Sequence, residues 1–204
     1  MFNFEDLKYL FKNGVVESKD TYKQDLIRNK KIIDEIDNYN KDFSQSLFLS
    51  WISNIFLRYI MLCSNEGEKY MIASFEKIHL LEKTKANWHP DLNIYNKYKD
   101  IDVDFIDYID FTHTEDEDFI LLKLCLLCTM NGESEINDKE SLYYDIKLRK
   151  DNKDVLVANG TSYTSNCPNC GAPTKINTFG VCDHCQELIS IYDSVWKIVN
   201  IKNV

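Results

Sequence analysis

Glycine and proline are scarce in this chain, with 6 and 3 residues among 204. Flexible linkers are usually rich in glycine, so this scarcity argues against a long one. Positive charge is also in deficit, because 24 Lys and Arg residues stand against 33 Asp and Glu, which gives a net charge of −9. Proteins that grip a phosphate backbone need a basic surface. The composition therefore argues against a nucleic-acid partner and against electrostatic docking on anionic lipid.

Long, clean apolar runs are missing as well. A transmembrane helix needs about 20 mostly apolar residues, and the nearest stretch, Leu47–Cys63, is interrupted by Ser50, Ser53, Asn54 and Arg58. The opening residues MFNFEDLKYLFK show none of the regions of a secretory signal. We therefore expect a cytoplasmic protein, with a peripheral position at the cytoplasmic face of the membrane as the alternative. In that compartment the seven cysteines are not a disulfide framework.

The hydrophobic period changes near the middle of the chain. From Phe43 to about Ser64, apolar residues recur at helical spacing, with Trp51 in the middle of the stripe. After residue 100 the period is two, and Phe119–Met130 is apolar on both phases apart from Lys123, as expected of a central strand covered on both faces. Two further strands are predicted at 142–150 and 194–201. Helices followed by strands predict an α+β fold with an antiparallel sheet wrapped around the apolar helices.

The first forty residues predict a separate helical extension, residues 1–41. A short helix is expected at Phe4–Lys12, and a polar helix is expected from a capping box at Thr21 and Gln24 to about Tyr39. Its apolar stripe, which includes Leu26, is thin. Such a stripe packs lightly on the body or on a second copy of the chain, so a homodimer through residues 1–41 is a further expectation.

Four cysteines lie in two C-x-x-C pairs, Cys167 with Cys170 and Cys182 with Cys185. Eleven residues separate the pairs. A C-x-x-C turn brings two sulfurs to one side of a tight loop, and four thiolates suit the tetrahedral geometry of zinc. The spacing therefore predicts a zinc ribbon at about 161–190 that holds one structural zinc ion per chain.

Other functions of this segment fit less well. A redox role leaves the second pair unexplained, and catalytic zinc needs an open coordination position, which four thiolates would close. His184 lies inside the second pair and is expected to point to water. Cys125 and Cys128 share the C-x-x-C spacing, but side chains three apart on a strand point to opposite faces, so these two are expected to pack in the core rather than share a metal.

At this point the chain resembles a known family. The segment CPNCGAP, the later GVCDHC and SVWKIV, and the helix start with the letters FLSW are similar to those of bacterial domains related to the mitochondrial inner-membrane translocase subunit 44. The resemblance covers about residues 42–201. It implies an α+β cone of the nuclear transport factor 2-like or cystatin-like type, with the ribbon inserted before the last strand. As binding residues it carries over Cys167, Cys170, Cys182 and Cys185.

Three functions remain open on these grounds. The first is a non-catalytic binding or scaffold module that takes a protein partner or an apolar ligand. The second is an enzyme that uses a polar group inside the cone, for which Asp107 is the candidate because it shares an alternation phase with Val103 and Phe105. A β-bulge near Ile106, which would turn Asp107 to water, is the favoured alternative. The third is a peripheral membrane factor that acts in translocation or recruits a chaperone.

Overall fold

The computed structural model describes residues 19–41, 43–64, 75, 79, 97–130, 139–152, 163–167, 170, 172–176, 179–182, 184, 188–190, 192 and 195–204. Two long helices come first, α2 (Lys19–Tyr39) and α3 (Gln45–Ser64). The strands that follow are β1 (Tyr98–His113), β2 (Glu117–Met130), β3 (Lys139–Asp151), β4 (Tyr163–Asn166), β5 (Pro173–Ile176), β6 (Phe179–Val181), β7 (Leu188–Ser190) and β8 (Trp196–Asn203). This order of elements confirms the α+β prediction.

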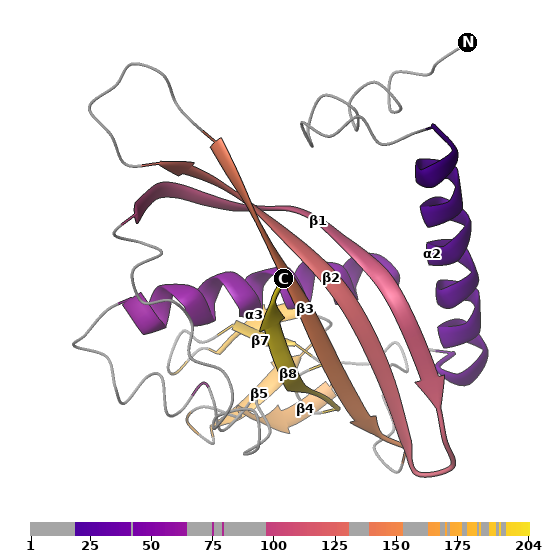
Figure 1. The fold of residues 1–204 in the computed structure, drawn as a ribbon. Coiled ribbons are helices and arrows are strands. Elements are labelled where there is room, and N and C mark those ends of the chain that lie inside the picture. Colours follow the sequence, from indigo (N-terminus) through magenta and orange to yellow (C-terminus); the bar gives the residue numbers. More distant parts are fainter. Residues whose placement is uncertain are drawn as a thin grey trace.

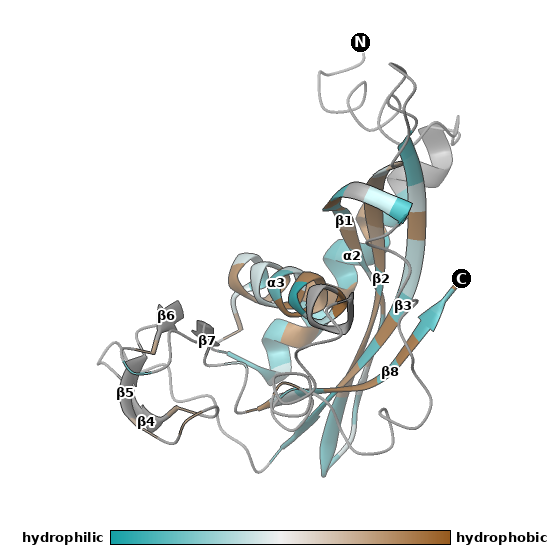
Figure 2. Cartoon of the chain, turned by 90° about the vertical axis from the view of Figure 1, so that its left-hand side faces the viewer, coloured by the Kyte–Doolittle hydropathy of each residue, from teal (hydrophilic) through white to brown (hydrophobic). Residues whose placement is uncertain are grey.

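The main sheet is open and antiparallel, with the strand order β1-β2-β3-β8. It lies in front of α3 in Figure 1, and the side view of Figure 2 places α3 on one side of the sheet. One face of the sheet therefore packs on α3. The cysteine segment, defined as residues 163–190, lies between β3 and β8 in the sequence.

Aromatic residues of α3 fill the inner face of the sheet. Phe48 is fully buried and Trp51 is 2% exposed, as the helical stripe predicts. Their rings pack on each other at 5.4 Å, and the ring of Phe48 meets that of Trp196 on β8 at 5.6 Å. The helix starts two residues later than the pattern suggested, because Ser44 precedes it and accepts the first helical hydrogen bond from the N–H of Phe48 at 2.9 Å. Among the described residues, no helix is long and apolar enough to cross a membrane.

Helix α2 runs along the β1 edge of the sheet (Figure 1). Ile32 and Ile36 are buried in the same core as the α3 aromatics. Leu26, which belongs to the predicted stripe, is 50% exposed, so the stripe does not pack on the body at this point, and the neighbouring Ile27 is 67% exposed. The capping box expected at Thr21 is wrong, because the helix already includes Lys19 and Thr21 lies within it.

Strand β1 carries irregularities that decide which residues face the core. Its register against β2 shifts between Val103 and Phe105, so that both Val103 and Ile106 contact the core cluster. A residue added to one strand of an antiparallel pair reverses the phase of everything after it. The bulge therefore lies at residue 104, two positions before the site expected from the sequence.

The helix predicted at 4–12 lies outside the described residues. Between residues 65 and 96 the structure describes Phe75 and His79, and both are helical and buried. The ring of Phe75 stacks on that of Tyr59 at 5.2 Å, so this part of the chain contributes to the α3 core.

Candidate metal centre

Two short hairpins present the cysteines. Strand β4 pairs with β5, and β6 pairs with β7, both antiparallel. Cys167 directly follows β4, Cys170 lies in the turn before β5, and Cys182 directly follows β6. The first turn is closed by a hydrogen bond of 2.7 Å from the N–H of Cys167 to the carbonyl of Ala172. The β4–β5 hairpin therefore carries Cys167 and Cys170 at its turn, and the β6–β7 hairpin carries Cys182.

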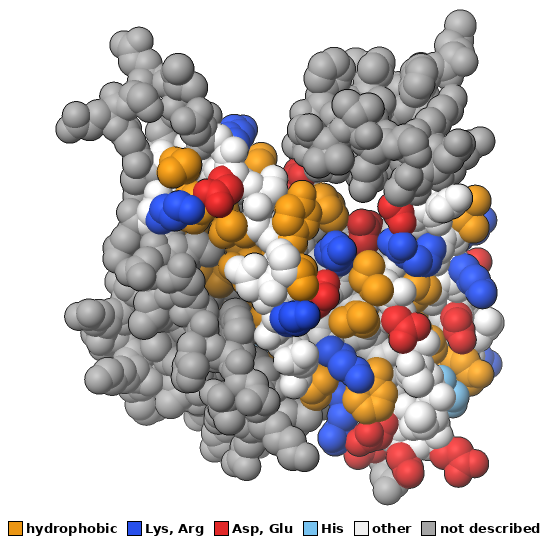
Figure 3. Space-filling model, in the orientation of Figure 1, with side chains coloured by type: hydrophobic (Ala, Val, Ile, Leu, Met, Phe, Trp, Pro, Cys, Tyr) orange, Lys and Arg blue, Asp and Glu red, His pale blue; other side chains and the backbone are white. Residues whose placement is uncertain are grey.

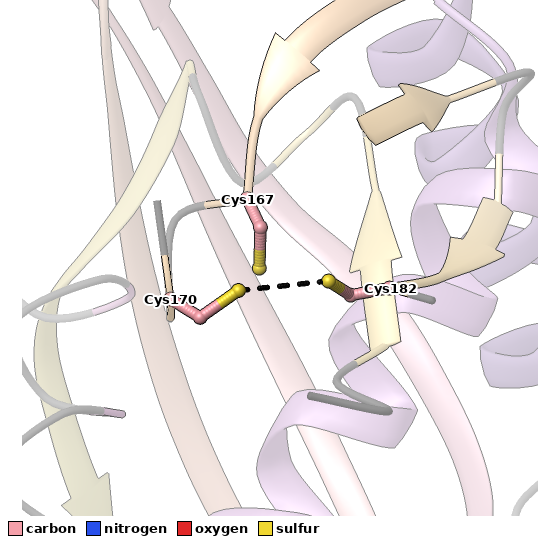
Figure 4. A group of neighbouring side chains, drawn as sticks. All are labelled: Cys167, Cys170 and Cys182. Carbon is pink, nitrogen blue, oxygen red and sulfur yellow. Dashed lines mark hydrogen bonds between the residues drawn. The ribbon is translucent and has the colours of Figure 1, made fainter. Parts of the chain in front are cut away.

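The three sulfur atoms form one cluster. The Sγ atoms of Cys167, Cys170 and Cys182 all lie within 4.8 Å of one another, and those of Cys170 and Cys182 are 3.7 Å apart (Figure 4). Cys167 and Cys182 are buried, whereas Cys170 is exposed. All three side chains point toward a common centre in Figure 4.

This geometry fits a metal ion better than a redox pair. Ligands at the corners of a tetrahedron, each about 2.3 Å from zinc, lie about 3.8 Å from one another. The 3.7 Å between the sulfurs of Cys170 and Cys182 matches that edge and far exceeds a disulfide bond of about 2.05 Å. The three thiols can therefore hold a metal ion. Cys185, the fourth predicted ligand, lies outside the described residues, and His184 is exposed as expected.

The other C-x-x-C pair behaves as packing residues. Cys125 and Cys128 are both fully buried on β2. Cys128 belongs to the core cluster on the α3 side, whereas Cys125 lies opposite Phe105 and Tyr143 on the other face. Burial raises the pKa of the Cys128 thiol to about 11. Two thiols on opposite faces of one strand cannot share an ion, which confirms the prediction for this pair.

Tyr192 anchors the exit of the cysteine segment. It is fully buried, and its hydroxyl accepts a hydrogen bond from the N–H of Ser44 at 3.1 Å and donates one to the Ser44 carbonyl at 3.2 Å. Its ring also meets Phe48 edge-on at 5.4 Å. Burial raises the pKa of Tyr192, with the Ser44 hydrogen bond acting against it, so the phenol stays protonated and able to donate. Because β8 starts four residues later, the path from the cysteine cluster to the last strand passes through this contact.

Comparison with models of known protein families finds no match, and no curated protein is significantly similar to the chain. The resemblance to domains of the translocase subunit 44 type therefore stays a prediction.

The sequence analysis missed a buried polar cluster at the end of the sheet. Asp118 is 1% exposed and faces Lys150 directly across β2 and β3. Its carboxylate is 3.3 Å from the Lys150 ammonium, accepts a hydrogen bond from the Asn40 amide at 3.1 Å, and lies 2.6 Å from Nδ1 of His113. Lys150 also donates a hydrogen bond to Oδ1 of the Asn40 side chain at 2.5 Å. Since Asn40 directly follows α2, the cluster joins that helix to three strands.

One signal in the sequence could have revealed this cluster. Lys150 continues the apolar phase of β3 after Ile146 and Leu148, and Asp118 shares the phase of Ile120 on β2. Opposite charges on the core phase of neighbouring strands indicate a buried pair. Burial alone would raise the pKa of Asp118, but hydrogen bonds from His113 and Asn40 and the charge of Lys150 together lower it.

We expect Asp118→Asn to lower the free energy of unfolding by about 3 kcal/mol, because it leaves the Lys150 ammonium buried without a counter-charge. The pKa of Asp118 is lower in the folded state, so its contribution is present above about pH 4, the unfolded value, and is lost as the pH falls through the folded value. Urea unfolding of both proteins at several pH values measures this, and the wild type should lose more stability than Asp118→Asn on acidification. The double variant Asp118→Asn, Lys150→Met should regain much of the loss. If it is additive instead, the two side chains are not coupled.

Asp107, the candidate catalytic residue, does not face the core. Its neighbours Ile106 and Tyr108 pack in the core cluster, which places Asp107 on the opposite face of β1. The position inside the cone is therefore wrong, and the favoured alternative, a bulge that turns Asp107 away from the core, is found. The side chain is half-buried rather than in open water, and it accepts a hydrogen bond from Nδ2 of Asn29 at 2.9 Å. Burial raises its pKa, and the Asn29 hydrogen bond acts against that rise. The side-chain oxygen of Asn29 also accepts a hydrogen bond from the backbone N–H of Tyr108 at 3.0 Å. Asn29 therefore joins α2 to the edge strand β1 and satisfies one of its backbone donors.

Proposed function

We propose that the chain is a non-catalytic binding or scaffold module whose cysteine segment is a zinc ribbon, held by Cys167, Cys170, Cys182 and Cys185 around one structural zinc ion. The convergence of three thiols from two hairpins carries this proposal. The spacing of Cys185 after Cys182 supplies the fourth thiolate, and such a closed site leaves no position for a substrate. Zinc in this setting adds to stability and performs no chemistry.

The metal has a structural role because of where the segment lies. Strands β3 and β8 are neighbours in the sheet, yet the chain between them runs from residue 152 to residue 195. A connection of that length is costly to order within a compact domain. Metal binding to a site that is absent from the unfolded chain becomes folding free energy. The ribbon thus acts as a clip for this crossing.

Other observations favour binding over catalysis. Asp107, on which the enzymatic alternative depended, holds α2 to the edge of the sheet rather than facing the core. Buried Asp118 is engaged with Asn40, Lys150 and His113. We further propose that the curved sheet and α3 form a cone of the nuclear transport factor 2-like type and that the protein works in the cytoplasm.

Metal analysis tests the proposal. Purified protein should contain one zinc ion per chain, and Cys182→Ser should lose most of it because one thiolate of the tetrahedron is gone. Cys125→Ala is the matched control, since that cysteine is buried on the main sheet and should leave the zinc content unchanged. Protein without zinc, or Cys182→Ser with full occupancy, would contradict the proposal.

A further inference from the structure

Strand β2 is apolar on the face that α3 does not cover, which is called the outer face here. Its outer side chains include Phe119, Leu121, Cys125 and Leu127, of which Cys125 is fully buried and the other three are half-buried. The outer residues of an antiparallel sheet that faces water are usually polar. Figure 3 shows this face with hydrophobic side chains between charges of both signs, and no described helix lies over it.

A row of alternating charge crosses the outer face. Direct strand partners place Asp107 beside Lys123, Lys123 beside Asp145, and Asp145 beside Lys202. The row therefore reads negative, positive, negative, positive from β1 to β8. Next to it lies an apolar row in which Cys125 separates Phe105 from Tyr143, whose rings are 6.3 Å apart.

The order of charges makes the row complementary to itself. If a second copy packs face to face about a two-fold axis that runs along the strands between β2 and β3, Asp107 meets Lys202 of the second copy and Lys123 meets its Asp145. The apolar rows then meet as well, with Cys125 opposite Tyr143. A two-fold axis perpendicular to the strands would instead place each charge against itself, which is unfavourable. The sequence of charges thus selects one symmetric arrangement.

We propose that the outer face is a self-association surface and that its partner is a second copy of this chain in this orientation. The inference names a partner for the proposed binding module and so rests on that proposal, whereas the metal site plays no part in it. Pairing within one sheet explains the alternation of charge. It also buries Cys125 and places the Lys147 ammonium 4.6 Å from the centre of the Phe119 ring, but it leaves Leu121 and Leu127 only half-buried.

The size of the surface sets the expected strength. Four strands about 4.8 Å apart and the nine residues from Phe119 to Leu127, at about 3.3 Å each, give a footprint on the order of 600 Å² per chain. A standard interface buries about 800 Å² per partner. We therefore expect a reversible dimer whose dissociation constant is micromolar.

Charge reversal tests this arrangement with the full, zinc-bound chain in sedimentation experiments over a range of concentrations. Lys123→Glu places a negative charge opposite Asp145 of the second copy. Asp145→Lys places a positive charge opposite Lys123 of the second copy. Each variant alone should dimerise about tenfold more weakly or worse. An equimolar mixture of the two should regain the dimer, because Glu at 123 then meets Lys at 145 across the interface. Lys30→Glu on the exposed side of α2 is the matched control and should dimerise as the wild type does.

Thermal unfolding of each variant shows whether it is folded, and the rescue in the mixture separates a lost interface from a lost fold. A wild type that stays monomeric at all concentrations overturns the proposal. So does a dimer that both single variants leave intact, which would place the interface elsewhere, for example on the exposed apolar residues of α2. Neither result changes the zinc content expected of the protein. Loss of the dimer can therefore be told apart from failure of the zinc proposal, which metal analysis tests.

Discussion

Trp51→Ala should lower the free energy of unfolding by about 3–5 kcal/mol, as expected for the removal of a large aromatic side chain from a packed core. Trp51 is 2% exposed, and its ring meets Phe48 at 5.4 Å and Tyr192 at 5.6 Å. Alanine would leave a cavity where α3, the inner face of the sheet and the exit of the cysteine segment come together. Urea unfolding, with the midpoint and slope fitted for both proteins, measures the change.

Leu26→Ala is the control for this measurement. Leu26 is 50% exposed on α2, so its truncation should change the free energy of unfolding by no more than about 0.5 kcal/mol. A loss below about 1 kcal/mol for Trp51→Ala would mean that the α3 face is not packed in solution and is kept for a partner or a membrane.

Hydrophobic period predicted the elements of this fold that pack on the core. The α3 stripe and the strands of the main sheet follow directly from apolar spacing, because a helix or strand must bury one face to be stable. The alternation of apolar and polar residues could not place the bulge at residue 104. One added residue reverses which face the later side chains occupy, and no residue type in the sequence marks where this happens. The sequence favoured a bulge near Ile106 that turns Asp107 away from the core. The structure has the bulge at residue 104 and places Asp107 against Asn29.

The cluster of cysteines was predictable for a different reason. A C-x-x-C pair brings its own two thiols together through local turn geometry, so the spacing alone indicates the chemistry. The cluster around Asp118 has no such local signature. It depends on Asn40, which is 78 residues away in the chain, and on the register that sets Asp118 opposite Lys150. Contacts of that kind follow from tertiary packing, and the phase of Lys150 was the available hint.

Zinc removal should have the second large effect. Zinc binds to structural sites in small domains with a free energy of about 10–16 kcal/mol. This binding free energy contributes to the folding of the residues that the metal holds together. A chelator should therefore open the cysteine segment. Strand β8 should follow, because it is an edge strand whose described backbone partner is β3 and because its start is tied to the segment through Tyr192.

If the ribbon clips the crossing into the last strand, hydrogen exchange with and without chelator should show it. Chelation should expose the amides of residues 163–190 and of β8 first, while α3 and β2, which form the centre of the core, stay protected for longer. The comparison requires peptide-level exchange at one pH. If the amides of the cysteine segment exchange freely after chelation while those of β8 keep full protection, the clip is contradicted, and the ribbon is an independent docking element for a partner.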